Sequence, residues 1–142
     1  MKTLKTVIAA CLLLISVSAF AADDENKEKL NIDNTLNTYV EAVTNGKIDG
    51  LKDILAEDVK FSVARSETVI NYTKSQLLNS LKESENVVQN CRTDYKVVKI
   101  NSLQAMVKVI MKYEGFRKIN YINLDKTRTG WKITNISSAY VE

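Results

Sequence analysis

The sequence contains no histidine and no proline, and only two cysteines and four glycines occur among its 142 residues. The absence of histidine excludes Ser-His-Asp and Cys-His catalytic groups and any histidine-ligated metal site. The two cysteines, Cys11 and Cys91, are too far apart to form a Cys-x-x-Cys zinc pair. The scattered glycines form neither a P-loop nor a dinucleotide fingerprint. Chemistry in this chain must therefore use carboxylates, tyrosines, lysines or arginines, and we expect neither a metal nor a cofactor.

Long apolar runs are also scarce, and the one that occurs lies near the start. Two lysines precede the apolar stretch Val7–Val17, and Ala19-Phe20-Ala21 offers a small-x-small cleavage site. The stretch is shorter than the roughly 20 residues that a membrane-spanning helix needs. We therefore expect residues 1–21 to be a signal peptide cleaved near Ala21. The product would be exported, periplasmic or secreted, without stable membrane insertion.

An alternative for this segment is lipid attachment at Cys11, because Ile8-Ala9-Ala10-Cys11 resembles a lipobox. The three-part layout of the signal favours the later cut, since the apolar core continues beyond the cysteine. Cys91 is then the single cysteine left. We expect it to be a buried, inert thiol, and a disulfide to another chain is the less favoured alternative.

A net excess of charge of either sign is nearly absent once the signal is removed. Without Lys2 and Lys5 the net charge falls from +3 to +1, over the 121 residues that remain. A nucleic-acid partner requires clustered lysine and arginine, so none is expected. The remaining length suits one domain. Residues 22–29 are charged and aperiodic and are predicted to be a solvated leader, which leaves residues 30–142 as the folded domain.

Helical and strand periods follow one another within residues 30–142. Apolar residues recur at helical spacing up to Asn45-Gly46, and a short second helix is expected around Leu51. Alternation predicts a strand at Val59–Val63 and a return strand at Glu67–Tyr72. Thr73-Lys74-Ser75-Gln76 has the pattern of a capping box, which predicts a third helix. Four further strands are expected at residues 91–100, 104–113, 117–124 and 131–141.

The predicted order is helix, helix, strand, strand, helix and four strands. Separate runs of helices and strands indicate an α+β domain, in which a curved antiparallel sheet wraps around the three helices. The short links are typical of an antiparallel meander. Such a sheet can leave a hollow between the layers, and we expect any function to lie there.

Two stretches and this element order resemble the nuclear transport factor 2-like superfamily, which includes SnoaL-like and ketosteroid isomerase-like proteins. The stretches are "NGKIDGLKDILAEDVKF", residues 45–61, and "GWKITNI", residues 130–136. Among the members, the chain looks most like the small exported bacterial proteins labelled "putative lumazine-binding". This resemblance implies a cone-like fold and a pocket for a heterocyclic ligand.

The resemblance to ketosteroid isomerase also bears on catalysis. The tyrosine that stabilises an oxyanion in that enzyme falls on Tyr39, but the position of its general base falls on Val63. Valine cannot accept a proton, and losing a general base typically costs about 10²–10⁴-fold in rate. The acid–base histidine of related dehydratases has no counterpart. The comparison therefore favours a protein that is not an enzyme.

Aromatic side chains are the best candidates for a ligand site, because pockets are mostly apolar and aromatic with a few orienting polar groups. A purely structural role in the core is the alternative for each of them. Arg65 follows the first predicted strand and could hold an anionic group with two hydrogen bonds, or could pair with Glu67 in an exposed turn. The predicted ligand-binding residues are Tyr39, Phe61, Arg65, Tyr95, Tyr113 and Trp131.

Three functions remain open. The first is a binding domain for a small apolar or aromatic, lumazine-like ligand, without catalysis. The second is an isomerase, dehydratase or cyclase that uses Asp94, Glu67 or Glu114 beside a tyrosine, although Asp94 fits a solvent-exposed face better. The third is a homodimeric interaction module that pairs through the outer sheet face. That face would carry Lys108, Lys112 and Lys132 among Met106 and Ile110.

Overall fold

The computed structural model describes residues 31–142. The predicted signal peptide, its cleavage site, Cys11 and the leader lie outside the described residues. The chain divides into two compact units, Met1–Asp33 and Asn34–Glu142, and the elements that form the site belong to the second. No helix in residues 31–142 combines the length and the apolar character that crossing a membrane requires.

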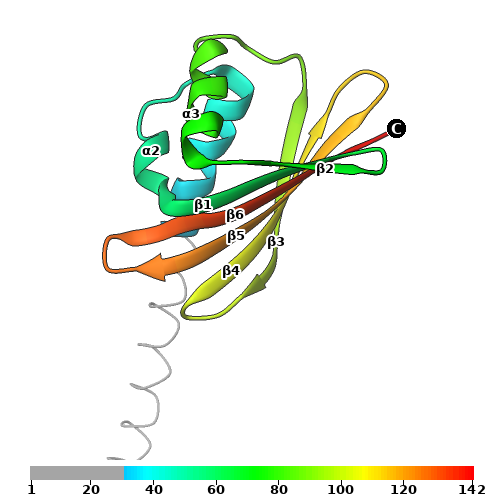
Figure 1. Cartoon of the computed structure of the whole chain (residues 1–142). Coiled ribbons are helices and arrows are strands. Elements are labelled where there is room, and N and C mark those ends of the chain that lie inside the picture. The colour runs from blue at the N-terminus through cyan, green and yellow to red at the C-terminus, as the bar shows by residue number, and fades with distance from the viewer. Residues whose placement is uncertain (1–30) are drawn as a thin grey trace, which may run out of the picture. The chain divides into compact units, whose positions relative to one another are not determined.

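The order of elements is the predicted one (Figure 1). Residues 31–45 are helical and are followed by α2 (Leu51–Ile54), β1 (Leu55–Arg65), β2 (Thr68–Tyr72), α3 (Lys74–Glu83), β3 (Arg92–Ile100), β4 (Gln104–Lys112), β5 (Arg117–Thr127) and β6 (Gly130–Val141). The α+β class is confirmed. Two strands are markedly longer than predicted. β1 extends beyond the predicted Val59–Val63 at both ends, and β5 continues to Thr127, so the loop predicted at residues 125–130 shrinks to the turn at Arg128-Thr129.

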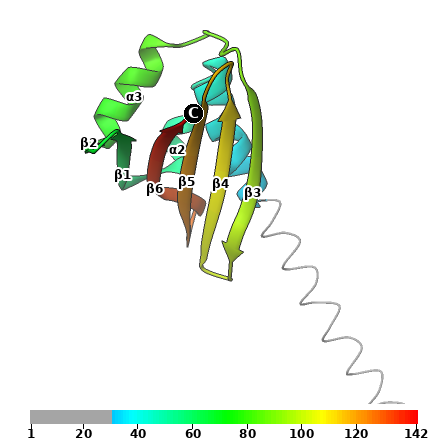
Figure 2. The same ribbon diagram turned by 90° about the vertical axis from the view of Figure 1, so that its right-hand side faces the viewer.

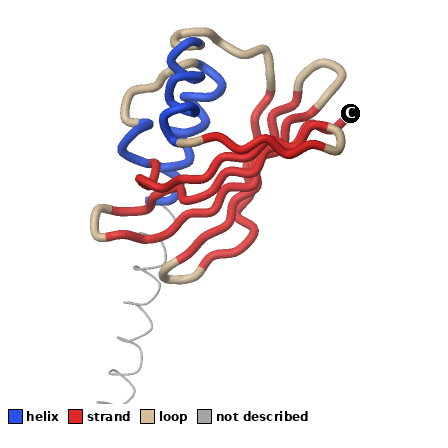
Figure 3. The backbone as a smooth tube through the Cα atoms, in the orientation of Figure 1, coloured by secondary structure: helices blue, strands red, loops and turns tan. Residues whose placement is uncertain are grey.

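The six strands form one curved open sheet in the order β2-β1-β6-β5-β4-β3 (Figures 2 and 3). Strands β3 to β6 are the predicted antiparallel meander. One pair departs from the prediction, because β1 and β6 run parallel. The last strand of the meander lies beside the first strand of the chain, so the two ends of the domain meet in the middle of the sheet.

The helices lie on one face of the sheet, which we call the inner face (Figures 1 and 2). Strand β4 shows why this face is apolar: Val107, Val109 and Met111 alternate with Met106 and other more exposed residues, and all three are buried. Leu36 and Tyr39 of the helix at residues 31–45 are also buried. The core therefore lies between the inner face and the helices, as period-2 strands and an amphipathic helix require.

The third helix begins as the capping pattern predicts. The Thr73 hydroxyl accepts a hydrogen bond from the Gln76 amide at 3.3 Å, and the Gln76 side chain accepts one from the Thr73 amide at 2.8 Å. Both bonds satisfy amide groups that a helix start would otherwise leave unpaired. The cap fixes α3 directly after β2 and turns Leu77 towards the core, where it is buried.

A β-bulge in β6 changes which side chains face the helices. Leu124 of β5 pairs with Ile133, but the neighbouring Asn123 pairs with Asn135, so Thr134 has no partner in the register. The extra residue moves the inner face from odd to even positions. Trp131 and Ile133 are buried before the bulge, whereas Ile136, Ser138 and Tyr140 share the inner face after it.

Candidate functional site

The cleft with the largest share of the predicted ligand-binding residues, which we call the main cleft, lies between the helices and the inner face of the sheet, where β6 ends. Its volume is about 290 Å³, and its lining includes five aromatic side chains: Tyr39, Phe61, Tyr113, Phe116 and Tyr140. A side cleft of about 240 Å³ shares Phe61, Leu77, Ser80, Lys118 and Tyr140 with it and extends along β1 to Arg65. The two clefts thus adjoin one another along these shared side chains beneath α3, and we call the pair the groove.

Backbone register explains why these residues meet. In the row nearest the groove, Met111 of β4 pairs with Lys118 of β5, which pairs with Tyr140 of β6. The next row places Asn120 opposite Ser138. Because both rows follow the inner parity of their strands, their side chains point towards the helices.

The deepest polar group in the main cleft is the hydroxyl of Tyr39, which is 2 % exposed. The Asn120 side-chain amide donates a hydrogen bond to this hydroxyl at 2.8 Å, and the Ser138 hydroxyl donates one to the Asn120 carbonyl oxygen at 2.5 Å. Asn120 and Ser138 are buried as well.

This chain of hydrogen bonds fixes the role of Tyr39. Because Ser138 donates to the carbonyl oxygen of Asn120, the NH₂ group of Asn120 is the side that faces Tyr39, and the Tyr39 oxygen is the acceptor of that bond. Among the described residues, the Tyr39 proton has no acceptor of its own. Burial raises the pKa of Tyr39 well above its ordinary value, which keeps the phenol neutral. Tyr39 can therefore donate a hydrogen bond to a molecule in the cleft.

Three rings form a continuous aromatic edge at the entrance of the cleft. Tyr113 stacks on Phe116 with a centroid distance of 4.6 Å and an angle of 7°, and Phe116 lies 6.1 Å from Tyr140. Phe116 and Tyr140 are 38 % and 42 % exposed. Burial, and after it the neighbouring Cys91, raises the pKa of Tyr113 to about 12. The entrance therefore offers flat, uncharged ring surface.

Two cations flank one of these rings. The guanidinium of Arg65 lies 5.4 Å from the centroid of the Tyr140 ring, and the Lys118 ammonium lies 5.8 Å from it. The ion pair between Arg65 and Glu67 that the sequence left open does not occur in the described part of the chain. Arg65 instead lines the side cleft.

Comparison with known proteins identifies the family of this chain. The family model described as "Putative lumazine-binding" matches residues 27–137. The chain belongs to this family. No protein with a curated description matches it.

Solved structures show the fold of this member of the family described as "Putative lumazine-binding". A "NTF-2 like protein of unknown function" from Silicibacter pomeroyi aligns with a TM-score of 0.70 at 14% identity, over 82% of this chain and 98% of its own. A similar protein from Shewanella baltica aligns with a TM-score of 0.66 at 14% identity, over 82% and 95%. A "putative aromatic ring hydroxylase" from Novosphingobium aromaticivorans gives 0.55 at 16% identity, over 82% and 90%. The nuclear transport factor 2-like fold is thus confirmed.

Four of the six predicted ligand-binding residues line the groove of this family member: Tyr39, Phe61 and Tyr113 in the main cleft and Arg65 in the side cleft. Trp131 and Tyr95 line neither. Trp131 is 3 % exposed at the start of β6, far along the strand from Tyr140, and packs in the core. Tyr95 is 39 % exposed because β3 is an edge strand, whose side chains have neighbours on one side only.

Sequence reasoning missed Lys118, Phe116 and Tyr140. Lys118 has the same parity as Asn120 and Ile122, so the strand pattern already carried the signal that it faces inward. Strict alternation from Trp131 would turn Tyr140 outward, and the bulge at Thr134 reverses that result. Phe116 lies in the link between β4 and β5, where no period applies.

The carboxylates that the enzymatic alternative needs lie elsewhere. Asp94 is exposed and contacts Lys112 at 3.5 Å, and Glu67 and Glu114 are exposed and line neither cleft. Val63, at the expected position of a general base, lines the side cleft opposite Ser138. Within residues 31–142, no three carboxylates or cysteines gather where a metal ion could bind.

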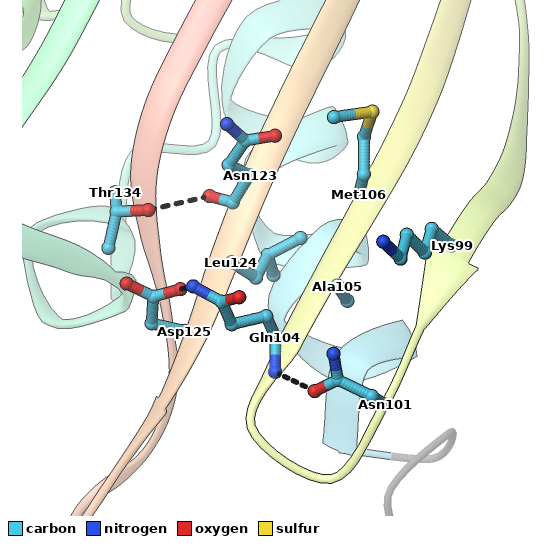
Figure 4. Close-up of a pocket in the computed structure, with 9 residues that line it drawn as sticks. All are labelled: Lys99, Asn101, Gln104, Ala105, Met106, Asn123, Leu124, Asp125 and Thr134. Atoms are coloured by element: carbon cyan, nitrogen blue, oxygen red, sulfur yellow. Dashed lines mark hydrogen bonds between the residues drawn. The ribbon is translucent and has the colours of Figure 1, made fainter.

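A further hollow of about 280 Å³ lies on the opposite face of the sheet, around the β3–β4 turn (Figure 4). Its polar groups are engaged with one another. The Gln104 side chain donates a hydrogen bond to Asp125 at 3.2 Å, the Asn101 side chain accepts from the Gln104 amide at 2.8 Å, and Thr134 donates to the carbonyl of Asn123 at 3.3 Å. These bonds stabilise the turn and the bulge and occupy polar groups that a ligand would otherwise contact. The inner groove therefore remains the candidate site.

Proposed function

We propose that this domain is exported and binds a small apolar or aromatic molecule in the main cleft, without transforming it. The observation that carries the proposal is the aromatic cleft with one buried hydroxyl, Tyr39, fixed as a donor. Ligand sites are typically apolar hollows of about 300 Å³ or more with a few orienting polar groups. The main cleft is close to that size, and the side cleft adjoins it.

The family description supports a planar heterocycle as the ligand. A flat ring can stack on the Tyr113–Phe116 edge, while a carbonyl or ring nitrogen accepts the proton of Tyr39. Lumazine itself has both features: a planar bicyclic ring and carbonyl oxygens on its edge. We therefore propose lumazine as the first compound to test.

The absence of catalysis is proposed from the lining of the groove. Proton abstraction requires a base within hydrogen-bond reach of the substrate, and the position where the fold would supply one is Val63. The described lining residues offer hydroxyl, amide and cationic groups. Incubation of candidate ketosteroids or epoxides with the protein should leave them unchanged, as judged by chromatography.

Occupancy of the cleft can be tested with a pair of tryptophan variants on α3. Ser80 lines both clefts, whereas the adjacent Asn79 is exposed and lines neither. Ser80→Trp should fill the groove and abolish lumazine binding in calorimetric titration. Asn79→Trp should bind as the unmodified protein does.

The same proteins should be examined by native mass spectrometry after purification. A co-purified small molecule should be present in the unmodified protein and in Asn79→Trp, and absent from Ser80→Trp. If Ser80→Trp retains both the co-purified molecule and lumazine affinity, the ligand does not occupy this cleft and the proposal is wrong.

A further inference from the structure

The groove holds two charged side chains among its described lining residues, and both are positive: Arg65 and Lys118. Three other lysines of the domain, Lys47, Lys74 and Lys112, pair with acids. Neither Arg65 nor Lys118 has an ion pair within residues 31–142. A groove with cations and no carboxylate has a positive potential towards its ligand.

Lys118 is the more informative of the two, because the fold turns it inward. It shares the inner face with Asn120, which is buried, and it is itself half-buried. A lysine in such a place loses part of its hydration, and only a neighbouring anion compensates for this loss fully. The protein supplies the face of the Tyr140 ring instead.

Tyr140 holds both cations at the entrance of the groove. Its ring lies within 6 Å of each charge, a range in which a cation and a ring attract one another. The phenyl ring of Phe116 lies 6.1 Å away on the same edge. Flat aromatic surface and positive charge thus meet at one point.

We propose that the natural ligand is an aromatic carboxylate, whose ring enters the main cleft while Lys118 and Arg65 bind its carboxylate beside Tyr140. This inference rests on the proposed binding function and adds the charge of the ligand. Arginine binds a carboxylate with two hydrogen bonds, and lysine adds a point charge. The ring of the ligand extends the Tyr113–Phe116 stack.

The test uses two probes with the same ring and nearly the same shape, one charged and one neutral: naphthalene-2-carboxylate and naphthalene-2-carboxamide, titrated into the full domain at neutral pH. We expect the carboxylate to bind about tenfold more tightly, because a hydrogen bond to a charged group is stronger than one to a neutral group. Added salt should weaken the binding of the carboxylate and not that of the carboxamide.

Variants assign the preference to the two cations. Lys118→Met and Arg65→Gln should each reduce the affinity for the carboxylate about three- to tenfold, by loss of one charged contact, and reduce the affinity for the carboxamide by a smaller factor, because only a neutral hydrogen bond is lost there. Lys118→Arg should restore the affinity for the carboxylate. The matched control is Lys108→Met, because Lys108 lies 5.7 Å from the ring of Tyr121 on the outer face and should have no effect.

Each outcome decides a different question. Equal affinity for the two probes overturns the carboxylate proposal and leaves the binding function standing. An equal loss of affinity for both probes in Lys118→Met means that the lysine only supports Tyr140, which also overturns it. If neither probe binds the unmodified domain, the carboxylate proposal fails, and the lumazine titration with Ser80→Trp separately decides the binding function.

Discussion

Tyr39 combines a structural and a binding role in one hydroxyl. Removing it in Tyr39→Phe leaves the buried Asn120 amide without its acceptor. An unsatisfied buried donor costs about 1–3 kcal/mol, so the free energy of unfolding should fall by that amount in urea denaturation. Ligand affinity should fall as well, since the donor in the cleft is lost.

Tyr121→Phe is the control for this prediction, because Tyr121 is 42 % exposed on the outer face. It should change the free energy of unfolding by less than about 0.5 kcal/mol. Unchanged stability of Tyr39→Phe would mean that Asn120 finds another acceptor, and the hydrogen-bond chain would then not fix the tyrosine.

Tyr113 makes the stability of the domain sensitive to alkaline pH. Its pKa rises from an ordinary 10.0 to about 12 in the folded protein, chiefly through burial. Between these values the folded state binds more protons than the unfolded state, so the free energy of unfolding decreases as pH rises from 10 to 12. The stabilisation is complete below pH 10. Tyr39, whose pKa is also raised, acts in the same direction.

Chemical denaturation at a series of pH values measures this slope. Tyr113→Phe should flatten it between pH 10 and 12, whereas the exposed-site variant Tyr121→Phe should leave it unchanged. An unaltered slope in Tyr113→Phe would contradict the shifted ionisation of Tyr113.

At the scale of elements, Gly46 ties the end of the helix at residues 31–45 to the end of α3. The Asn86 amide donates a hydrogen bond to its carbonyl at 3.0 Å, and its φ is +67°. A Cβ at this position would lie 2.4 Å from the nitrogen of Asn86 and 2.5 Å from the oxygen of Ser84. Only glycine fits such a close approach.

Gly46→Ala should therefore destabilise the domain by about 2–5 kcal/mol, through the sum of left-handed strain and overpacking. Gly115 is the matched control, since its φ is +88° and no atom lies within 4 Å of a Cβ built there. Gly115→Ala should lose only about 1–2 kcal/mol, the strain alone. Thermal and urea unfolding measure both losses of stability. Equal losses in the two variants would show that the contact between Gly46 and the end of α3 is not rigid.

The local signals in the sequence predicted the elements well and the site less completely. The Thr73–Gln76 cap and the end of the first helix at Asn45-Gly46 depend on neighbouring residues, so the sequence reveals them directly. The parallel pairing of β1 with β6 depends on residues about 75 positions apart, such as Phe61 and Ile136, which local patterns do not connect. The bulge at Thr134 is set by the register between β5 and β6, which the alternation within β6 does not reveal, so the strand period alone placed Tyr140 on the wrong face.

For the whole molecule, the outer face of the sheet decides whether two copies pair. This face is amphipathic rather than uniformly apolar: Met106 is 37 % exposed, and Lys108 and Lys112 alternate with Ile110 on the same strand. Stable homodimers usually bury more apolar surface than such a mixture provides. The homodimer suggested by the sequence stays a prediction, and light scattering at high protein concentration measures it directly.

A periplasmic binding function requires that the chain is exported and its signal peptide removed. Expression of the full sequence in a bacterium with two membranes should yield a periplasmic protein whose first residue is Ala22, as read by mass spectrometry of the purified product. Ala21→Phe should block cleavage and leave the longer form, because signal peptidase accepts only small residues there.

Cys11→Ser separates the two ways in which the signal could be processed. It should not alter the periplasmic yield or the new N-terminus if cleavage follows Ala21. A lipid-modified product that begins at Cys11, and that disappears in Cys11→Ser, would instead place the domain at a membrane surface.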